Sequence, residues 1–68
     1  MVDGSNRAEF VDVEVIREIT SVILMCRVGT KIVAVPPRRM LPGTTILTTA
    51  DRGRLVLSRE LALNLGLI

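Results

Sequence analysis

The chain has 68 residues; 49% of them are hydrophobic, 24% are charged and only Phe10 is aromatic. A chain of this length forms one domain, and it buries only about 60% of the surface that its unfolded form exposes. Domains below roughly 70–80 residues usually gain stability from disulfides, a metal or a partner subunit. The sequence has one cysteine, Cys26, and no histidine, which excludes an internal disulfide and the usual zinc spacings. We therefore expect self-association, as a dimer or a higher oligomer, with no cofactor and no bound metal.

The sequence shows neither an apolar run of membrane-spanning length nor the features of a secretory signal. No segment approaches the ~18 consecutive apolar residues that a membrane span needs. The N-terminus lacks the basic start and the apolar run of a secretory signal. A single free cysteine within an apolar run fits a reducing compartment. We expect a cytoplasmic protein that has no contact with membranes.

Charge is distributed unevenly, although the formal net charge is only +2. Residues 1–20 carry five acidic side chains against two arginines, a balance of −3, and residues 21–68 carry seven basic against two acidic, a balance of +5. Nearly all the cations are arginine, whose planar fork suits phosphates, carboxylates and guanine edges. The asymmetry indicates either a polyanionic partner or pairing of the two halves across a dimer.

The first half of the chain predicts strands. Residues 1–8 show no periodicity and are expected to be a flexible arm, followed by a single β-rich domain from residue 9 to residue 68. From Phe10 the pattern alternates, with Val11, Val13 and Val15 on one side, which is typical of a half-buried strand. Beyond Val15 the alternation blurs.

A hairpin is the strongest structural signal. Residues 21–28 are a nearly continuous apolar run, which periodicity alone cannot distinguish from a buried helix, but its length and the following Gly29-Thr30 favour a strand entering a tight turn. Residues 31–35 then return as the partner strand. Two prolines end the hairpin, and residues 36–43 are expected to be a loop that carries a solvated pair, Arg38 and Arg39.

The second half predicts two more strands and a helix. Residues 44–49 have strong β-propensity and are expected to form a fourth strand; residues 50–53 form a turn and residues 54–57 a fifth strand. Ser58 is a good helix N-cap, and Gly66 suits the left-handed residue that ends a helix. The sequence therefore predicts a mostly β, small single domain of about five short strands, as a β-barrel or swapped-hairpin-like fold, with one short C-terminal helix.

Catalytic chemistry is poorly represented. The sequence has no histidine for general base work, no glycine-rich phosphate loop and no nucleophile elbow. The apolar neighbours of Cys26 predict a buried, unreactive thiol. We expect a non-enzymatic protein with no catalytic residue.

The segment 51–67 resembles the core motif of AbrB-like looped-hinge (swapped-hairpin) DNA-binding domains, which include transition-state regulators and antitoxins. In that family a Gly-Arg pair precedes three apolar strand residues; a proline, a variable residue and Glu-Leu follow, and a short helix closes in Leu-Gly-Ile. The matching positions here are Gly53-Arg54, Leu55-Val56-Leu57, Glu60-Leu61 and Leu65-Gly66-Leu67. Ser58 replaces the family's proline and Ala62 a frequent basic residue. The family's further strands follow its helix, whereas the hairpin 22–35 precedes the motif here.

The resemblance implies a compact dimer of two interleaved chains that meets duplex DNA through Arg52, Arg54 and Arg59, and Arg38 and Arg39 are further candidates. Such arginines can contact phosphates for affinity and guanine edges for specificity. The alternative is that they are solvated or pair with nearby carboxylates. The expected function is a homo-oligomeric DNA-binding regulator or antitoxin-like protein, and the alternative is a protein-interaction or assembly module. A small RNA-binding barrel fits less well, because such barrels usually present aromatic side chains for base stacking.

Overall fold

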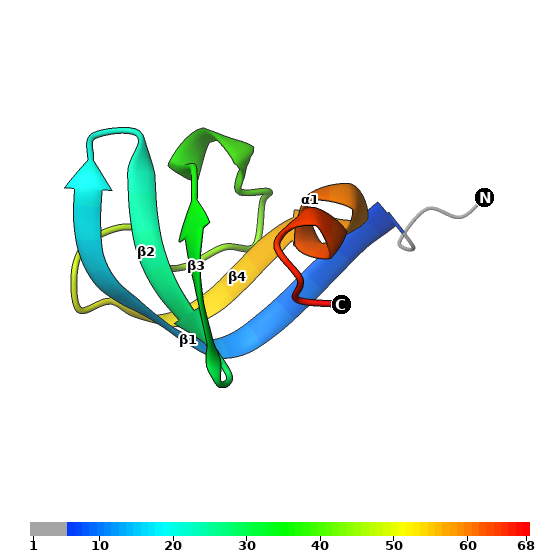
Figure 1. The fold of residues 1–68 in the computed structure, drawn as a ribbon, viewed down its shortest axis with the longest axis horizontal. Coiled ribbons are helices and arrows are strands. Elements are labelled where there is room, and N and C mark those ends of the chain that lie inside the picture. Colours follow the sequence, from blue (N-terminus) through cyan, green and yellow to red (C-terminus); the bar gives the residue numbers. More distant parts are fainter. Residues whose placement is uncertain (1–5) are drawn as a thin grey trace.

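Four antiparallel strands and one short helix make up residues 6–68, the part of the chain that the computed structural model describes (Figure 1). The strands form one sheet in the order β3-β2-β1-β4, and a 3-10 turn, η2, follows β3. The prediction of a mostly β single domain with one short C-terminal helix is confirmed. The elements in chain order are β1 (Arg7–Thr20), β2 (Ile23–Val28), β3 (Lys31–Val35), η2 (Pro37–Arg39), β4 (Arg52–Ser58) and α1 (Arg59–Asn64).

Strand β1 is long and bent, and it belongs to two pairings at once (Figure 1). Its first half pairs with β4, from Arg7 opposite Ser58 to Glu14 opposite Arg52. Its second half pairs with β2, from Glu14 to Thr20. The strand begins at Arg7, so the last two residues of the expected flexible arm belong to the sheet; residues 1–5 of that arm lie outside the described residues.

Bulges in β1 explain why the alternation of the sequence blurs. The register shifts between Phe10 and Val13, where Asp12 has a φ of 56°, a left-handed conformation that aspartate tolerates better than most residues. Further shifts lie between positions 15 and 17 and between 18 and 20. A bulge changes which residues face inward. Val11 was expected on the same side as Val13, and that expectation is wrong: Val13 is fully buried whereas Val11 is 68% exposed.

The predicted hairpin is confirmed. Strands β2 and β3 pair from Leu24 opposite Val35 to Val28 opposite Lys31, without a register shift. The two-residue turn between them places Gly29 at φ +62°, which glycine adopts at no steric cost. The expected loop after the hairpin contains η2, in which Arg38 and Arg39 are both exposed.

The predicted strand over residues 44–49 is wrong, because this segment forms an irregular loop along the outer edge of β4. The amide of Leu41 donates to the carbonyl of Val56 at 2.8 Å, and that of Thr45 to the carbonyl of Arg54 at 2.9 Å. The hydroxyls of Thr44 and Thr45 accept from the amides of Val56 and Arg54, both at 2.9 Å. Threonine side chains thus replace carbonyls as acceptors for the amides of β4, and this pattern interrupts a regular ladder.

The turn before β4 lies earlier than predicted. Strand β4 begins at Arg52, within the segment 50–53 that was expected to be the turn. The chain instead reverses over residues 48–51, where the amide of Asp51 donates to the carbonyl of Thr48 at 3.0 Å. The carboxylate of Asp51 accepts from the amides of Leu47 and Thr48, at 2.9 and 2.8 Å. An aspartate that bonds its own loop in this way sets the position of the turn.

The interior is aliphatic, as the composition predicts, apart from Phe10 at its margin and the Cys26 thiol. Helix α1 covers one end of it, and Leu61 and Leu65 pack on the buried cluster. The predicted helix ends are confirmed: the Ser58 hydroxyl accepts from the amide of Leu61 at 3.1 Å, and Gly66 has a φ of +78°. The buried cluster consists of Val13, Val15, Leu24, Cys26, Val33, Val35, Ile46, Leu55 and Leu57.

Candidate nucleic-acid interface

A row of charged side chains crosses the outer face of the sheet. Arg52 of β4 lies opposite Glu14 of β1, and Glu14 lies opposite Arg27 of β2. The Nη1 atom of Arg27 is 3.2 Å from Oε1 of Glu14, which is the only ion pair within 4.0 Å among residues 6–68. Both side chains are substantially exposed, at 53% and 40%, so the pair itself stabilises the fold by only about 0–1 kcal/mol. The pair matters because it shows that Arg27, Glu14 and Arg52 lie side by side on the outer face of three neighbouring strands.

Three more arginines share this face. Opposite residues of an antiparallel pair, and residues two apart on one strand, point to the same side of a sheet. Arg54 is two residues from Arg52 on β4 and therefore points to the same side. Arg17 lies opposite Met25, which points outward because its neighbours on β2 are buried. Arg7 lies opposite Ser58, which is on the same side of β4 as Arg52 and Arg54. By the same rule two carboxylates, Glu9 and Glu14, belong to this face. Five positive charges against two negative leave a balance of +3. We call this surface the arginine face, and it consists of Arg7, Glu9, Glu14, Arg17, Arg27, Arg52 and Arg54.

Of the five arginines expected from the sequence to meet DNA, the structure brings two together on this face, Arg52 and Arg54. Arg59 begins α1, beyond the opposite end of β4, about 23 Å from the start of that strand at ~3.3 Å per residue. Arg38 and Arg39 lie on η2, after the edge strand β3. They form a separate basic site on another element.

Sequence reasoning missed Arg17 and Arg27. Arg27 lies in a continuous apolar run, and Arg17 lies where the bulges of β1 disrupt the alternation. A signal for Arg27 existed: a two-residue turn at Gly29-Thr30 fixes the register of the hairpin, and Arg27 then alternates with the buried Cys26. No such signal existed for Arg17, because the face of the sheet to which its side chain points depends on how many bulges precede it in β1.

The loop before β4 is held by hydrogen bonds to the ionised carboxylate of Asp51. Hydrogen bonds from the amides of Thr48 and Leu47 hold the pKa of the Asp51 carboxyl below its usual value. The folded state therefore prefers the ionised carboxylate. This contribution to stability is fully present above the pKa of the unfolded chain, about 3.9, and it is lost as the pH falls through the lower pKa of the folded protein.

Replacing Asp51 with asparagine is expected to remove this part of the pH dependence. Thermal unfolding followed by circular dichroism from pH 6 to pH 2.5 measures it: the melting temperature of the wild type should fall more steeply below pH 5 than that of Asp51→Asn. Asp12→Asn is the matched control, because Asp12 accepts no described hydrogen bond from a side chain or loop amide, and it should follow the wild type. Parallel curves for wild type and Asp51→Asn would contradict the role of the charge.

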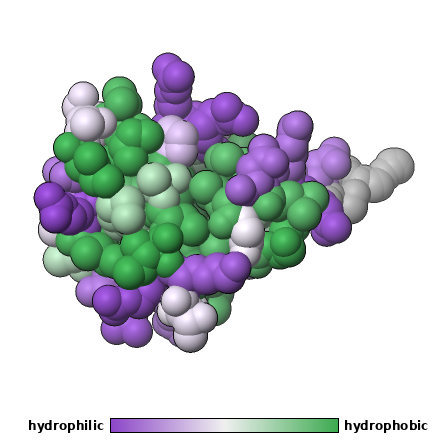
Figure 2. Space-filling view, viewed as in Figure 1, coloured by the Kyte–Doolittle hydropathy of each residue, from purple (hydrophilic) through white to green (hydrophobic). Residues whose placement is uncertain are grey.

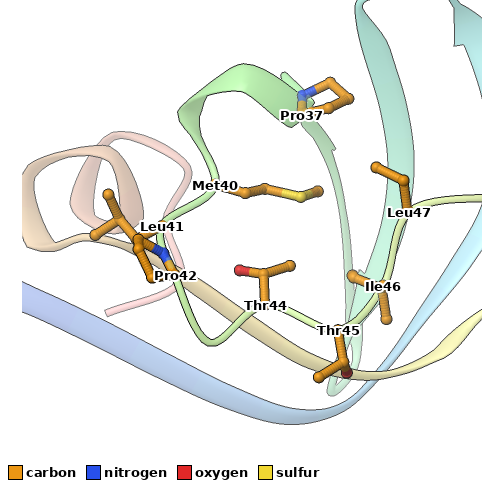
Figure 3. A pocket seen from close by; sticks show the side chains of 8 residues that line it. All are labelled: Pro37, Met40, Leu41, Pro42, Thr44, Thr45, Ile46 and Leu47. Carbon is orange, nitrogen blue, oxygen red and sulfur yellow. The ribbon is translucent and has the colours of Figure 1, made fainter.

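A shallow pocket lies within the loop that connects β3 to β4 (Figure 3). It has a volume of about 460 Å³, and the side chain of Met40 extends across it toward Ile46 and Leu47. No ionisable side chain lines it, so it offers room for an apolar group but no acid or base. Its lining residues are Pro37, Met40, Leu41, Pro42, Thr44, Thr45, Ile46 and Leu47.

The groups that could carry other chemistry are few. Cys26 is fully buried, and desolvation by burial raises the pKa of its thiol, which disfavours the reactive thiolate. Within residues 6–68, no three His, Cys, Asp or Glu side chains are placed to hold a metal ion. In that same range, no helix has the length and apolar character needed to cross a membrane.

Comparison with known proteins gives no relative: no protein-family model, no curated protein and no solved structure matches this chain.

Proposed function

We propose that this protein is a small binding module whose ligand is duplex DNA, and that the arginine face holds the phosphate backbone. The observation that carries the proposal is the convergence of Arg17, Arg27 and Arg52, from three neighbouring strands, on one surface. Arg54 extends the row along β4. The regulator or antitoxin-like role expected from the sequence is the finer form of this proposal.

The physical chemistry of the face suits a polyanion. Arginine presents several donors in a planar fork and can bind a phosphate through two of them. Each phosphate neutralised releases counterions, so an excess of three positive charges gives affinity that falls as salt rises. The only described aromatic side chain, Phe10, is partly buried in the interior. Backbone contacts to a duplex therefore fit this surface better than stacking on single-stranded bases.

The resemblance of segment 51–67 to the AbrB-like motif supports the same partner from an independent direction. In that motif the Gly-Arg pair begins the strand before the helix, and here it corresponds to Gly53 and Arg54 in β4. Arg59, which the resemblance also implies, would contact DNA only if the duplex extended past the far end of β4. The proposal therefore assigns the main contacts to Arg52 and Arg54.

Removing two of these charges tests the proposal. The double variant Arg52→Ala/Arg54→Ala is expected to weaken binding to a mixed-sequence duplex at least about tenfold at low salt, and to reduce the slope of log K against log salt by about 2. Fluorescence anisotropy with a labelled duplex, titrated at several salt concentrations, measures both quantities. Circular dichroism of the variant verifies that the fold is retained.

Two controls make this result specific. Arg38→Ala/Arg39→Ala removes the same two charges from η2 and should bind within about threefold of the wild type, since the charges that it loses lie off the face. Glu14→Gln removes a carboxylate from the centre of the face and should bind DNA more tightly. Equal losses in the two arginine pairs would indicate attraction by net charge alone. A wild-type protein that ignores duplex DNA at low salt would refute the proposal.

A protein-interaction or assembly role is the second candidate, and the distribution of apolar surface favours it. Seven large hydrophobic side chains are at least half exposed, and Figure 2 shows broad apolar areas on the face that it views. Contiguous apolar surface of this kind marks interaction sites. An oligomer that forms without DNA and does not bind it would favour this role over the first. The seven are Val11, Ile19, Val22, Ile32, Leu47, Leu63 and Ile68.

A further inference from the structure

The edges of the sheet differ in how they are protected. The outer edge of β4 is covered by residues 41–45, which bond to it at Val56 and Arg54. The first half of β1, which β2 does not reach, carries the bulge at Asp12 and the charged Arg7 and Glu9. Bulges, charges and covering loops are the usual devices that keep a sheet edge from pairing with another chain.

Among the described residues, strand β3 has neither a bulge nor a loop hydrogen-bonded to its outer edge. It is the outermost strand of the sheet, its register with β2 is regular throughout, and its only charged residue, Lys31, lies at its beginning. Ile32, in the strand itself, is 54% exposed. No described hydrogen bond outside the β2–β3 ladder involves a residue of β3. An edge of this kind is a template for a further strand.

The hairpin register determines which backbone groups are free. In an antiparallel pair closed by a two-residue turn, Val28 and Lys31 exchange hydrogen bonds, and such pairs alternate with pairs that do not. The pairs made by Ile32 and Ala34 are of the second type. The amides and carbonyls of Ile32 and Ala34 therefore point away from β2, toward the free edge of the sheet. Each of the two residues offers one donor and one acceptor there, and Val33 lies between them.

We propose that β3 pairs antiparallel with β3 of a second copy of this chain, about a two-fold axis at Val33. In this register Ile32 lies opposite the partner's Ala34, and the free amides and carbonyls of these residues form four hydrogen bonds across the axis. Val33 faces its own counterpart on the inner side. The two Lys31 residues are about 14 Å apart along the strand direction, at ~3.4 Å per residue, so salt largely screens their repulsion.

The register also suits the side chains. Ile32 and Ala34 point to the outer side of the sheet, and in the pair each covers the other's exposed surface. Pro36 and Pro37 stop the strand directly after Val35, which limits the pairing to five residues per chain. A two-fold axis perpendicular to the sheet keeps both outer surfaces on the same side. If the proposed function holds, the two arginine faces would then be presented to one duplex.

The experiment changes the charges at the two residues that meet across the axis. The variant Ile32→Lys/Ala34→Lys places like charges opposite each other in both halves of the pair, whereas Ile32→Lys/Ala34→Glu places opposite charges there. Molar mass by light scattering after size-exclusion chromatography, over a range of protein concentrations, is the measurement, and no DNA is present. Circular dichroism melts verify that both variants fold.

We expect the wild type and the Lys/Glu variant to show twice the 7.4 kDa of one chain, and the Lys/Lys variant to show a single chain. Leu47→Lys changes an apolar residue of the loop before β4 that is 59% exposed, and it should leave the dimer intact. A monomeric wild type, or a Lys/Lys variant that remains dimeric, would overturn the pairing. A Lys/Glu variant as monomeric as the Lys/Lys variant would overturn the register. None of these outcomes depends on DNA binding.

Discussion

Replacing Leu55 with alanine is expected to lower the free energy of unfolding by about 3 kcal/mol, within the range of about 2–5 kcal/mol for a buried leucine. Leu55 is fully buried in β4 and belongs to the aliphatic cluster. It lies opposite Phe10 of β1, and its removal leaves a cavity between β4 and the rest of the buried cluster. The short chain has few other apolar side chains that could move to fill it.

The size of the effect follows from the size of the domain. A chain of this length has a total stability of roughly 3–10 kcal/mol, at about 0.05–0.15 kcal/mol per residue. A loss of this magnitude lowers the melting temperature by about 12–24 °C, at roughly 4–8 °C per kcal/mol. Urea unfolding and thermal melts by circular dichroism measure both quantities.

The matched control is Leu63→Ala. It makes the same chemical change on α1, where the side chain is 56% exposed, and it should alter stability by no more than about 0.5 kcal/mol. Similar losses in the two variants would mean that Leu63 is covered by another chain or that the core does not depend on Leu55. The concentration dependence of the Leu63→Ala melt separates these explanations.

Replacing Gly53 with alanine is expected to cost about 2–4 kcal/mol, combining steric overlap with a lost hydrogen bond. A Cβ atom at this position would overlap Oγ1 of Thr45. That hydroxyl cannot rotate away without cost, because it accepts the amide hydrogen of Arg54. The substitution therefore displaces the loop that covers the edge of β4, next to the arginines of the proposed interface.

A double-mutant cycle tests this cause. Thr45→Ala alone loses the hydrogen bond and should cost about 1 kcal/mol. In Gly53→Ala/Thr45→Ala the overlapping atom is gone, so the double variant should be more stable than the sum of the two single losses predicts, by at least about 1 kcal/mol. Simple additivity would show that the contact with Thr45 is not the source of the strain.

The elements that the sequence predicted correctly depend on signals that act over a few residues. Glycine followed by a polar residue between two apolar runs specifies the β2–β3 hairpin, and the adjacent prolines end it. Ser58 and Gly66 mark the two ends of α1 through their own hydrogen bond and backbone conformation. Such features need no information about distant parts of the chain, because the atoms that interact are close in sequence.

The elements that it predicted wrongly depend on distant partners. Residues 44–49 have the composition of a strand, but Thr44 and Thr45 bond to β4 through their hydroxyls. The bulges of β1 arise because one strand must pair with β4 and then with β2 around a bend. Neither the edge that these threonines meet nor the number of bulges is encoded locally.

By itself, the sequence determined the hairpin, the capped helix, the aliphatic interior and two of the arginines on the arginine face. Only the tertiary structure decided that Arg17 joins Arg27, Arg52 and Arg54 there, while Arg38, Arg39 and Arg59 lie elsewhere. The reason is the two-residue period of a strand: a shift of one position transfers every following side chain to the other face. In β1 these shifts are set by pairing with partners up to 51 positions away in the chain, as for Arg7 and Ser58, and the periodicity of a single segment does not carry that information.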